Sequence, residues 1–498
     1  MPSVPPSQSA ASAIAVLGSA SDVGKSLVST ALCRMFADAG YDTVPFKAQN
    51  MANQAGVTAE GLEMPRAQIL QAHACRKPPS VDMGPVLMKP VTLTGAQIVV
   101  LGKATGYKEA RDYFADTSRL ASIADDALGR LLAAHQVVVI EGAGSPVEIN
   151  LWNRDFTNLH PARRASAAII LVVDIDRGGS FAQAKGTLDL MPQLDRERVI
   201  GLVVNRFRGD LSLFDEGITL LERICEVPVL AVVPHCDHGL DEEDRPIRIP
   251  IDEAPLPGKL HVGAVLYPRV SNTEDLSPLL YEPDVQLTWI TQPKLILEQD
   301  VIVLPGTKAT LADLIQITAL GVAEAIGSAV AQGTWVLGLC GGYQMLGGQL
   351  LDAAGTEGGP NQWRGLNLLP FDTEFGNEKV LGQRSLVSAW PERNLPLFGY
   401  EIHHGRSALN ANRGEPLAMT FGAELGWACE RVAGAYLHGL LASDSWRAAF
   451  LNRVRADKKL PTQPVRAALD IDLRISRWAA HVKAHLRPGA WERIIAAL

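Results

Sequence analysis

The chain has 498 residues, of which 47% are hydrophobic and 20% are charged, and its formal net charge is −8. This composition is typical of a globular protein, and the length favours about two to four domains. The acidic balance argues against a nucleic-acid-binding protein and against a basic protein of the membrane surface. Its six cysteines form no C-x-x-C pair, so we expect reduced thiols in a cytoplasmic protein rather than a disulfide framework.

The amino-terminal segment carries no sign of a targeting signal. Residues 1–12, MPSVPPSQSAAS, have neither a basic start nor a long apolar stretch, which predicts a disordered leader rather than a signal peptide. The longest apolar run, Ala165–Val173, is too short to span a bilayer. We therefore expect no membrane partner.

A glycine-containing loop follows the first predicted strand. Ile14–Leu17 is the strand, GSASDVGKS occupies Gly18–Ser26, and a helical pattern covers Leu27–Ala39. This order is the context of a P-loop, whose backbone N–H groups cradle the phosphates of a nucleotide while Lys25 reaches the β- and γ-phosphate oxygens. The residues predicted to bind ATP are Gly18, Ser21, Asp22, Gly24, Lys25, Ser26 and Asn205.

The loop also indicates which kind of P-loop protein this is. Its first glycine stands one position early, because Ser19 holds the usual place. Partitioning ATPases of the ParA/MinD type carry an extra lysine where this chain has Ala20, which disfavours a partner-sensing switch. The loop instead resembles that of dethiobiotin synthetase, an ATP-dependent enzyme that activates a carboxyl group.

Two polar stretches and one acidic residue complete the predicted synthetase site. PFKAQNM at Pro45–Met51 and GLEMPRAQ at Gly61–Gln68 are dense in polar residues, although a solvated loop would also account for any one of them. Glu141 ends the apolar strand Val137–Ile140, where a P-loop domain commonly places a Mg²⁺ ligand. The residues predicted to contact substrate are Lys47, Gln49, Asn50, Arg66 and Gln68, and the predicted Mg²⁺ ligands are Ser26, Glu63 and Glu141.

Alternating strands and helices predict the architecture of this half. Ile169–Asp174, Gly201–Asn205 and Val229–Val233 are further apolar strands separated by helical stretches, which predicts an α/β fold with a mostly parallel sheet. His235–His238, with the sequence HCDH, has no second ligand pair at zinc-site spacing and is interpreted as a loop. The proline-rich, charged residues 237–259 are predicted to be the linker after a synthetase domain at 13–236.

The second half is organised around a cysteine. Trp335–Leu339 is a short apolar strand, Cys340 stands at its end, and Gly341-Gly342 leads into a helical pattern. A nucleophile on such a sharp strand-to-helix turn is exposed at the top of a sheet, and this context favours a nucleophile over a buried structural cysteine. The oxyanion hole is predicted from the Gly341 N–H and from the turn at Gly306 and Thr307, which follows another strand.

The base must come from elsewhere in the chain. His438 follows the strand-like residues 432–437 and precedes Gly439, and the ends of strands are where such sheets carry chemistry. A cysteine and a histidine far apart in sequence can pair in space. His403 and His404 are the alternatives.

The ordered set of motifs resembles the cobyric acid synthase family from about Ile14 to Leu441. The motifs that carry the resemblance are GSASDVGKS, PFKAQNM, EMPRAQ, PVLMKP, EGAGSPVEINL, DIDRGG, VVNRFRGD, LPGTKAT, GLCGGYQMLGG, GYEIHHGR and AYLHGL. The resemblance implies a P-loop NTPase-like, dethiobiotin-synthetase-like domain. It also implies a class I glutamine amidotransferase-like, flavodoxin-like domain at 260–447, with Cys340 as nucleophile and His438 as base. Residues 448–498 are predicted to be a helical tail.

The resemblance also implies an activity. The family amidates the b, d, e and g carboxylates of adenosylcobyrinic acid a,c-diamide, with glutamine as nitrogen donor and with ATP and Mg²⁺. The expected partners are therefore small molecules, and a homo-oligomer is left open. The alternatives are a synthase that makes the a,c-diamide and a regulatory P-loop ATPase with an inactive glutaminase-like domain.

Two positions depart from the expected pattern. Leu440 stands where many class I amidotransferases carry a glutamate two residues after the catalytic histidine, so the partner that orients His438 is left open, with Glu401 as a guess. Gly84 stands where the family pattern leads us to expect an asparagine.

Overall fold

The computed structural model describes residues 11–90, 94–115, 117–240, 247–353, 355–357, 362–410, 418–419, 425–467 and 470–498. Most of the predicted leader, part of the predicted linker and part of the loop after Leu351 lie outside these residues. The chain divides into two compact units. Unit 1 comprises the described residues of Met1–Ala52, Glu63–Leu240 and Asp470–Leu498, and unit 2 those of Asn53–Leu62 and Asp241–Leu469.

Unit 1 is built on a six-stranded sheet in which all neighbouring strands are parallel. Its order is β12 (Val229–Pro234), β11 (Val199–Phe207), β10 (Ala168–Asp174), β1 (Ser12–Gly18), β9 (Val137–Glu141) and β2 (Thr43–Phe46). Because the strands are parallel, their carboxyl ends meet at one edge. The P-loop after β1, Glu141 of β9 and Asn205 of β11 therefore lie at the same edge of the sheet.

Helices cover both faces of this sheet. In β1, Ala15 and Leu17 face one apolar cluster while Ile14 and Val16 face another, as the two-residue period of a strand requires. The helices of this part of the chain are α1 (Lys25–Asp38), α2 (Arg66–Ala74), α3 (Ala110–Ala115), α4 (Ser118–Ala134), α5 (Leu159–Arg164), α6 (Ser180–Leu190), α7 (Gln193–Arg196) and α8 (Asp215–Cys225). A smaller sheet of unit 1 has the order β3 (Gln49–Met51), β6 (Val86–Pro90), β7 (Gly95–Val100) and β8 (Lys103–Glu109), and β5 is Glu63–Pro65.

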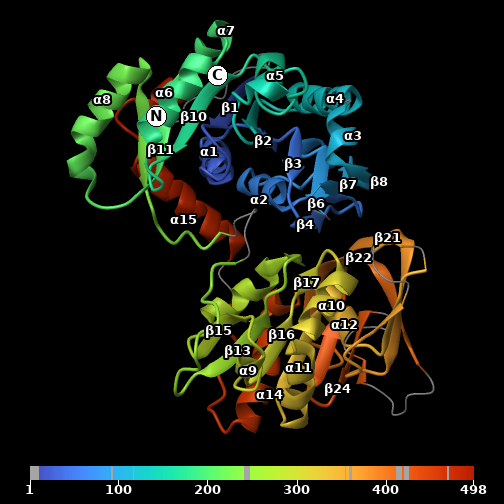
Figure 1. The fold of residues 1–498 in the computed structure, drawn as a ribbon. Coiled ribbons are helices and arrows are strands. Elements are labelled where there is room, and N and C mark those ends of the chain that lie inside the picture. The colour runs from blue at the N-terminus through green and yellow to red at the C-terminus, as the bar shows by residue number, and fades with distance from the viewer. Residues whose placement is uncertain are drawn as a thin grey trace. The chain divides into compact units, whose positions relative to one another are not determined.

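The last two helices return to unit 1 and do not form the separate tail that the sequence predicts. α15 (Ile471–Ala484) lies beside α1 in Figure 1, and α16 is Ala490–Ala496. Trp478 is 3% exposed and its Nε1 donates to the Leu27 carbonyl oxygen at 2.7 Å. The reason is burial of apolar surface, because Ile475, Trp478 and Ile494 join the same cluster as the α1 face of the sheet.

Unit 2 contains a seven-stranded sheet. Its order is β15 (Val285–Ile290), β13 (Leu260–Val265), β16 (Val301–Leu304), β18 (Trp335–Leu339), β25 (Val432–Ala435), β24 (Gly426–Cys429) and β23 (Ala418–Met419). The first five strands are parallel to one another. β24 is antiparallel to β25, and β23 is antiparallel to β24. The helices of this unit are α9 (Pro293–Ile296), α10 (Thr310–Ala319), α11 (Val322–Ala331), α12 (Gly341–Met345) and α14 (Asp444–Asp457). The predicted α/β class with mostly parallel sheets is confirmed.

Two smaller sheets surround the carboxyl ends of these strands. One pairs β14 (Val270–Ser271) with β17 (Gly306–Thr307), and the other has the order β20 (Gln362–Arg364), β19 (Gln349–Leu351), β21 (Phe371–Val387) and β22 (Pro396–Leu409). The segment Asn53–Leu62, which contains β4 (Ala55–Val57), also belongs to unit 2. Its Ala55 carbonyl oxygen accepts from Asn272 at 2.9 Å, and its Val57 carbonyl oxygen accepts from Gln383 at 3.0 Å.

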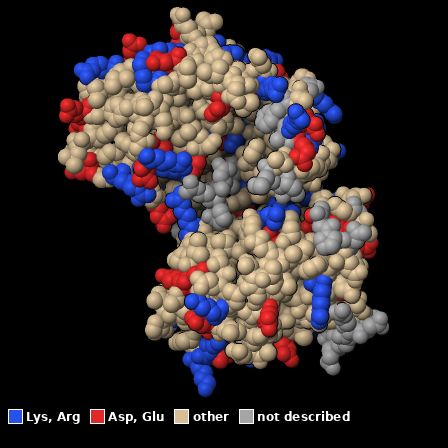
Figure 2. Space-filling model, in the orientation of Figure 1, with Lys and Arg blue, Asp and Glu red and all other residues tan. Residues whose placement is uncertain are grey.

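On the face shown in Figure 2, described basic and acidic side chains are interspersed over each unit. Within the described ranges, no single helix is long and apolar enough to cross a membrane. α10 and α11 meet that criterion only as a pair bent by 80°.

Candidate functional site

Cys340 occupies a strained turn between β18 and α12. Its φ of 49° and ψ of −107° are rare for a residue with a side chain, and strain of this kind is concentrated at functional sites. The Cys340 side chain is 7% exposed, and its Sγ lies 3.6 Å from the Ile402 carbonyl oxygen on β22. The predicted strand–cysteine–helix turn is present.

The glycines after Cys340 are required by close packing. A Cβ on Gly342 would lie 2.0 Å from the Leu304 carbonyl oxygen, and a Cβ on Gly341 would lie 2.6 Å from Thr307 Cγ2. No side chain fits at these distances. The start of α12 is therefore held directly against the strand that carries the predicted oxyanion turn.

His438 stands three residues after β25 and is paired with an aspartate. Its Nδ1 lies 2.7 Å from Asp275 Oδ2, and Asp275 Oδ1 accepts from the Gly439 N–H at 2.7 Å. His438 is 1% exposed and Asp275 is 4% exposed. Asp275 lies in η4 (Thr273–Tyr281), a 3₁₀ helix that follows β14. The carboxylate therefore holds the imidazole in one orientation.

The charges around His438 favour its protonated form. Burial on its own would lower the pKa of His438, but the negative charge of the Asp275 carboxylate, with the electrostatic interaction of His438 with Cys340, outweighs burial and raises this pKa well above its usual range. Cys340, His438 and Asp275 thus form a connected nucleophile–base–orienting group, which is the arrangement of a covalent catalyst.

The guess that Glu401 orients His438 is wrong. Glu401 instead accepts hydrogen bonds from Arg384 and from His403 Nε2, the latter at 3.1 Å. Asp275 is not among the residues predicted from the sequence. The signal used for His438 does not mark Asp275, because Asp275 lies in a 3₁₀ helix after β14, a strand of the separate two-stranded sheet that β14 forms with β17.

The predicted oxyanion residues lie around the cysteine. A Cβ on Gly341 would be 3.1 Å from the Thr307 backbone nitrogen, and a Cβ on Gly306 would be 3.1 Å from His438 Cε1. Thr307 is fixed by its hydroxyl, which donates to Asp313 at 2.5 Å. Gly306, Thr307 and Gly341 are brought together, and their role in binding an oxyanion stays a prediction.

In unit 1 the P-loop lysine folds over its own loop. Lys25 Nζ donates to the carbonyl oxygens of Ala20 and Gly144, both at 2.9 Å. Asn205 Nδ2 donates to the Val23 carbonyl oxygen at 2.9 Å and closes the other side of the loop. Gly24 has a φ of 96°, and a Cβ there would lie 2.0 Å from Asn205 Nδ2, so only glycine fits.

Asp22 and Ser21 also belong to this loop. Asp22 Oδ1 lies 3.1 Å from an Arg206 guanidinium nitrogen, and its Oδ2 is 2.5 Å from Arg177. Ser21 Oγ would be 3.8 Å from a Cβ on Gly144. All residues predicted to bind nucleotide are therefore gathered around the carboxyl end of β1.

Glu141 is the centre of a buried polar group beside the P-loop. Its Oε1 accepts from Ser26 Oγ at 2.7 Å and from Lys47 Nζ at 2.8 Å, and its Oε2 accepts from Gln71 at 2.5 Å. Burial on its own would raise the pKa of Glu141. The Lys47 ammonium, with the Ser26 and Gln71 hydrogen bonds, outweighs burial and holds this pKa below its usual range. An ionised carboxylate next to a hydroxyl is an oxygen donor set that suits Mg²⁺.

Other predicted residues have different neighbours. Lys47, predicted to contact substrate, donates to Glu141, and so does Gln71, which is not among the predicted residues. The predicted metal ligand Glu63 pairs with Lys89, Nζ to Oε1 2.5 Å, and both side chains are buried.

The remaining predicted substrate residues lie on β3 and α2. Asn50 and Gln68 are buried and hydrogen-bonded to each other at 3.1 Å. Gln49 accepts from the Tyr113 hydroxyl, and Arg66 begins α2.

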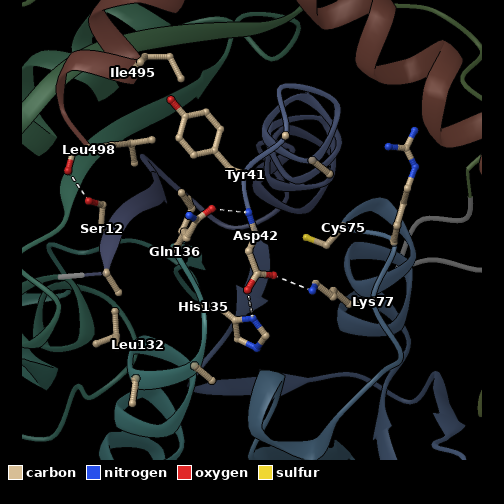
Figure 3. Close-up of a pocket in the computed structure, with 17 residues that line it drawn as sticks. Ser12, Tyr41, Asp42, Cys75, Lys77, Leu132, His135, Gln136, Ile495 and Leu498 are labelled. Carbon is tan, nitrogen blue, oxygen red and sulfur yellow. Dashed lines mark hydrogen bonds and ion pairs between the residues drawn. The ribbon is translucent and has the colours of Figure 1, made fainter. Parts of the chain in front are cut away.

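A cavity of about 1240 Å³ lies at the opposite edge of the unit 1 sheet, where β1 and β9 begin (Figure 3). Asp42 on its wall pairs with Lys77 at 2.6 Å and with His135 at 3.0 Å. None of the predicted site residues lines this cavity. It is therefore separate from the P-loop site.

Comparison with known proteins identifies two domains along the chain. Residues 14–247 match the family model described as the CobQ/CobB/MinD/ParA nucleotide binding domain, and residues 261–446 match the CobB/CobQ-like glutamine amidotransferase domain. The cobyric acid synthase of Chlorobium phaeobacteroides (strain BS1) is 42% identical over 494 residues, which are 97% of this chain and 99% of the relative. That of Chlorobaculum tepidum is 46% identical over 454 residues, or 88% and 90%. With a nucleotide-binding unit, a Cys–His–Asp site and relatives that match along nearly the whole chain, the protein belongs to the cobyric acid synthase family.

Proposed function

We propose that the chain catalyses the ATP- and glutamine-dependent amidation of the b, d, e and g carboxylates of adenosylcobyrinic acid a,c-diamide in cobalamin biosynthesis. The observation that carries the proposal is the Cys340–His438–Asp275 group in a chain that also has a P-loop with Lys25 and Glu141. The relatives named cobyric acid synthase support the same reaction.

The glutaminase half-reaction takes place at Cys340. The Cys340 thiolate attacks the carboxamide carbon of glutamine, and the Gly341 and Thr307 N–H groups stabilise the oxyanion. His438, in its protonated form, gives a proton to the departing ammonia, which leaves a thioester on Cys340. His438 then takes a proton from water, the hydroxide attacks the thioester, and glutamate is released.

The synthetase half-reaction takes place at the P-loop. The substrate carboxylate attacks the γ-phosphorus of ATP, and ADP leaves as an acyl phosphate forms. Ammonia then displaces phosphate to give the amide. Lys25 would lie against the transferring phosphoryl group. Ser26 and Glu141 would hold Mg²⁺, which neutralises developing charge on the phosphate oxygens when it is bound; Glu63 is proposed as a further ligand.

Mass spectrometry of the product tests the proposal. The a,c-diamide incubated with the enzyme, ATP and glutamine should undergo four successive carboxylate-to-amide mass changes. Cys340→Ala should lose the reaction with glutamine but retain it with ammonium. No mass change with either nitrogen source would contradict the proposal, as would amidation of the a and c carboxylates of cobyrinic acid instead.

Glutamate release separates the enzyme from a regulatory ATPase. A regulator with an inactive glutaminase-like domain should release no glutamate, with or without ATP and corrinoid. The connection of Asp275 to His438 argues against that alternative, because an inactive site has no need of an oriented base.

A further inference from the structure

The ring of Tyr400, on β22, stacks against the imidazole of His438. The ring centroids lie 5.1 Å apart, and the ring planes differ by 22°. The backbones exchange two hydrogen bonds, from the Tyr400 N–H to the His438 carbonyl oxygen at 3.1 Å and from the His438 N–H to the Tyr400 carbonyl oxygen at 2.9 Å. A Cβ on Gly399 would lie 2.0 Å from the His438 carbonyl oxygen, so no side chain fits there. Tyr400 therefore contacts the base through both its backbone and its ring.

The contact with Asp275 does not by itself fix the plane of the imidazole. It places Nδ1 of His438 2.7 Å from the carboxylate. A single hydrogen bond tolerates some tilt of the ring about the line between its two heavy atoms, because its energy depends mainly on the distance and on the donor angle. A stacked aromatic ring limits this tilt, since the edge of one ring would be driven into the face of the other. Tyr400 is therefore placed to fix the ring plane, and with it the direction of Nε2.

The Tyr400 hydroxyl is itself held by polar groups. It accepts from Asn272 Nδ2 at 2.7 Å, and it lies 3.1 Å from Glu274 Oε1 and 3.2 Å from the Ala55 carbonyl oxygen. Asn272 Nδ2 also donates to the Ala55 carbonyl oxygen at 2.9 Å, and both of these residues are buried. The two N–H groups of the amide are then both in use. The outer end of the tyrosine is thus fixed by buried polar contacts.

The segment that holds the tyrosine is the one that orients the base. Asn272 is the N-cap residue of η4, which contains Asp275, and its carbonyl oxygen accepts from the Asp275 N–H at 3.1 Å. Asparagine is a favoured capping residue, yet the Asn272 side chain makes no hydrogen bond to cap its own helix and contacts Tyr400 instead. Two residues three positions apart therefore hold the imidazole and the ring that stacks on it.

We propose that Tyr400 is a positioning residue that fixes the ring plane of His438, and that Asn272 and the Ala55 carbonyl oxygen fix Tyr400 in turn. The inference rests on the proposed glutamine chemistry, in which the imidazole gives a proton to ammonia and later takes one from water. Both transfers require Nε2 to point at the reacting atoms, so the plane of the ring decides their rate.

One of these contacts comes from the first half of the sequence. Ala55 belongs to the segment Asn53–Leu62, which is part of unit 2 although it lies in the sequence between Asn50 and Arg66, two of the residues predicted to contact substrate. Within unit 2 this segment reaches the ring that stacks on the base. The glutaminase site is therefore not assembled from the second half of the chain alone.

Steady-state glutamine hydrolysis by variants of the full chain tests the proposal. Tyr400→Leu removes the aromatic plane and should lower kcat by about 10- to 100-fold, because a small misplacement of a catalytic group costs that much. Tyr400→Phe keeps the plane and loses only the hydroxyl, so kcat should fall by about two- to tenfold. KM for glutamine should stay near that of the parent in both variants, since Tyr400 acts through the base.

Phe398→Leu is the matched control. Phe398 lies two positions earlier on β22 and is 62% exposed, so the same aromatic-to-leucine change should leave kcat at the parent value. Denaturant unfolding and ammonium-supported amidation report whether each variant is folded. A parent-like kcat in Tyr400→Leu, or an equal loss in Phe398→Leu, would overturn the proposal. A raised KM at unchanged kcat in Tyr400→Leu would also overturn it, because Tyr400 would then bind substrate.

Nuclear magnetic resonance of the unmutated protein gives a test that does not depend on a folded variant. With labelled histidine and tyrosine rings, nuclear Overhauser effects should connect the ring protons of Tyr400 and His438, and their absence would overturn the proposal. A parent enzyme that releases no glutamate would instead contradict the proposed function. The ring contacts seen by resonance would still decide whether Tyr400 lies against the imidazole.

Discussion

The Asp275 carboxylate lies 2.7 Å from Nδ1 of His438, although the two residues are 163 positions apart in the sequence. The second Asp275 oxygen binds the Gly439 N–H, so the carboxylate is fixed by the segment that carries the base. A histidine held through Nδ1 presents Nε2 for proton transfer. Asp275 therefore supplies the carboxylate that orients His438, which the leucine at position 440 cannot do.

Asp275→Asn should lower the rate of glutamine hydrolysis by about 10²- to 10⁴-fold. The asparagine amide can occupy the same space but no longer stabilises the imidazolium, and it favours the wrong tautomer of His438. The measurement is glutamate release at saturating glutamine. Ammonium-supported amidation should continue at the rate of the parent.

Glu282→Gln is the control, because Glu282 is the C-cap residue of η4, the 3₁₀ helix that contains Asp275. Glu282 binds Arg447 at 3.0 Å and Arg455 at 3.3 Å, both on α14. This variant should lower the stability of unit 2 without a selective loss of glutamine hydrolysis. Equal losses of hydrolysis in the two variants, at equal stability, would argue against a role for Asp275 in orienting the base.

The Asp275–His438 pair should stabilise the fold most at low pH. The pKa of His438 is raised above its value in the unfolded chain, so the pair contributes fully below about pH 6.5 and loses its contribution as pH rises through the folded pKa. Denaturant unfolding of the parent and of Asp275→Asn should therefore give stabilities that differ most near pH 6 and converge at alkaline pH. A difference that is independent of pH would contradict the raised pKa.

The sequence predicted the parts of the fold that depend on local patterns. The strand Trp335–Leu339 has the predicted bounds, and the turn that follows it places Cys340 and two glycines as expected. His438 was found because a polar residue at a strand end is a local signal as well. The P-loop is also a local signal, because its strand, loop and helix are consecutive in the sequence.

The remaining features depend on pairings between distant segments. Asp275 lies in a short 3₁₀ helix whose position is set by tertiary packing, and no periodicity marks it as a partner of His438. Gln71 reaches Glu141 from α2 in the same way. The helical tail was predicted as helix, but its amphipathic pattern does not say which apolar face it covers, and α1 provides that face.

Trp478→Ala should destabilise unit 1 by about 3 to 5 kcal/mol, because it removes a buried aromatic ring from the contact between α15 and α1. The indole also loses its hydrogen bond to Leu27. Leu473→Ala is the matched control on the same helix, since Leu473 is 42% exposed, and its effect should stay below about 0.5 kcal/mol. Similar losses in the two variants, measured by denaturant unfolding, would mean that α15 does not stabilise unit 1.

Glu141→Gln should abolish ATP-dependent amidation while leaving basal glutamine hydrolysis in place. The substitution removes the anionic oxygen beside Ser26 and replaces the buried Lys47–Glu141 ion pair by a contact with a neutral amide, which should cost about 3 kcal/mol of stability. The double variant Glu141→Gln/Lys47→Met removes both charges and should recover much of that stability without recovering amidation. Amidation with either nitrogen source, ADP release and denaturant unfolding are the measurements. If the double variant regains amidation together with stability, Glu141 acts only as the structural partner of Lys47, because a residue needed for phosphoryl transfer cannot be replaced by restoring the fold.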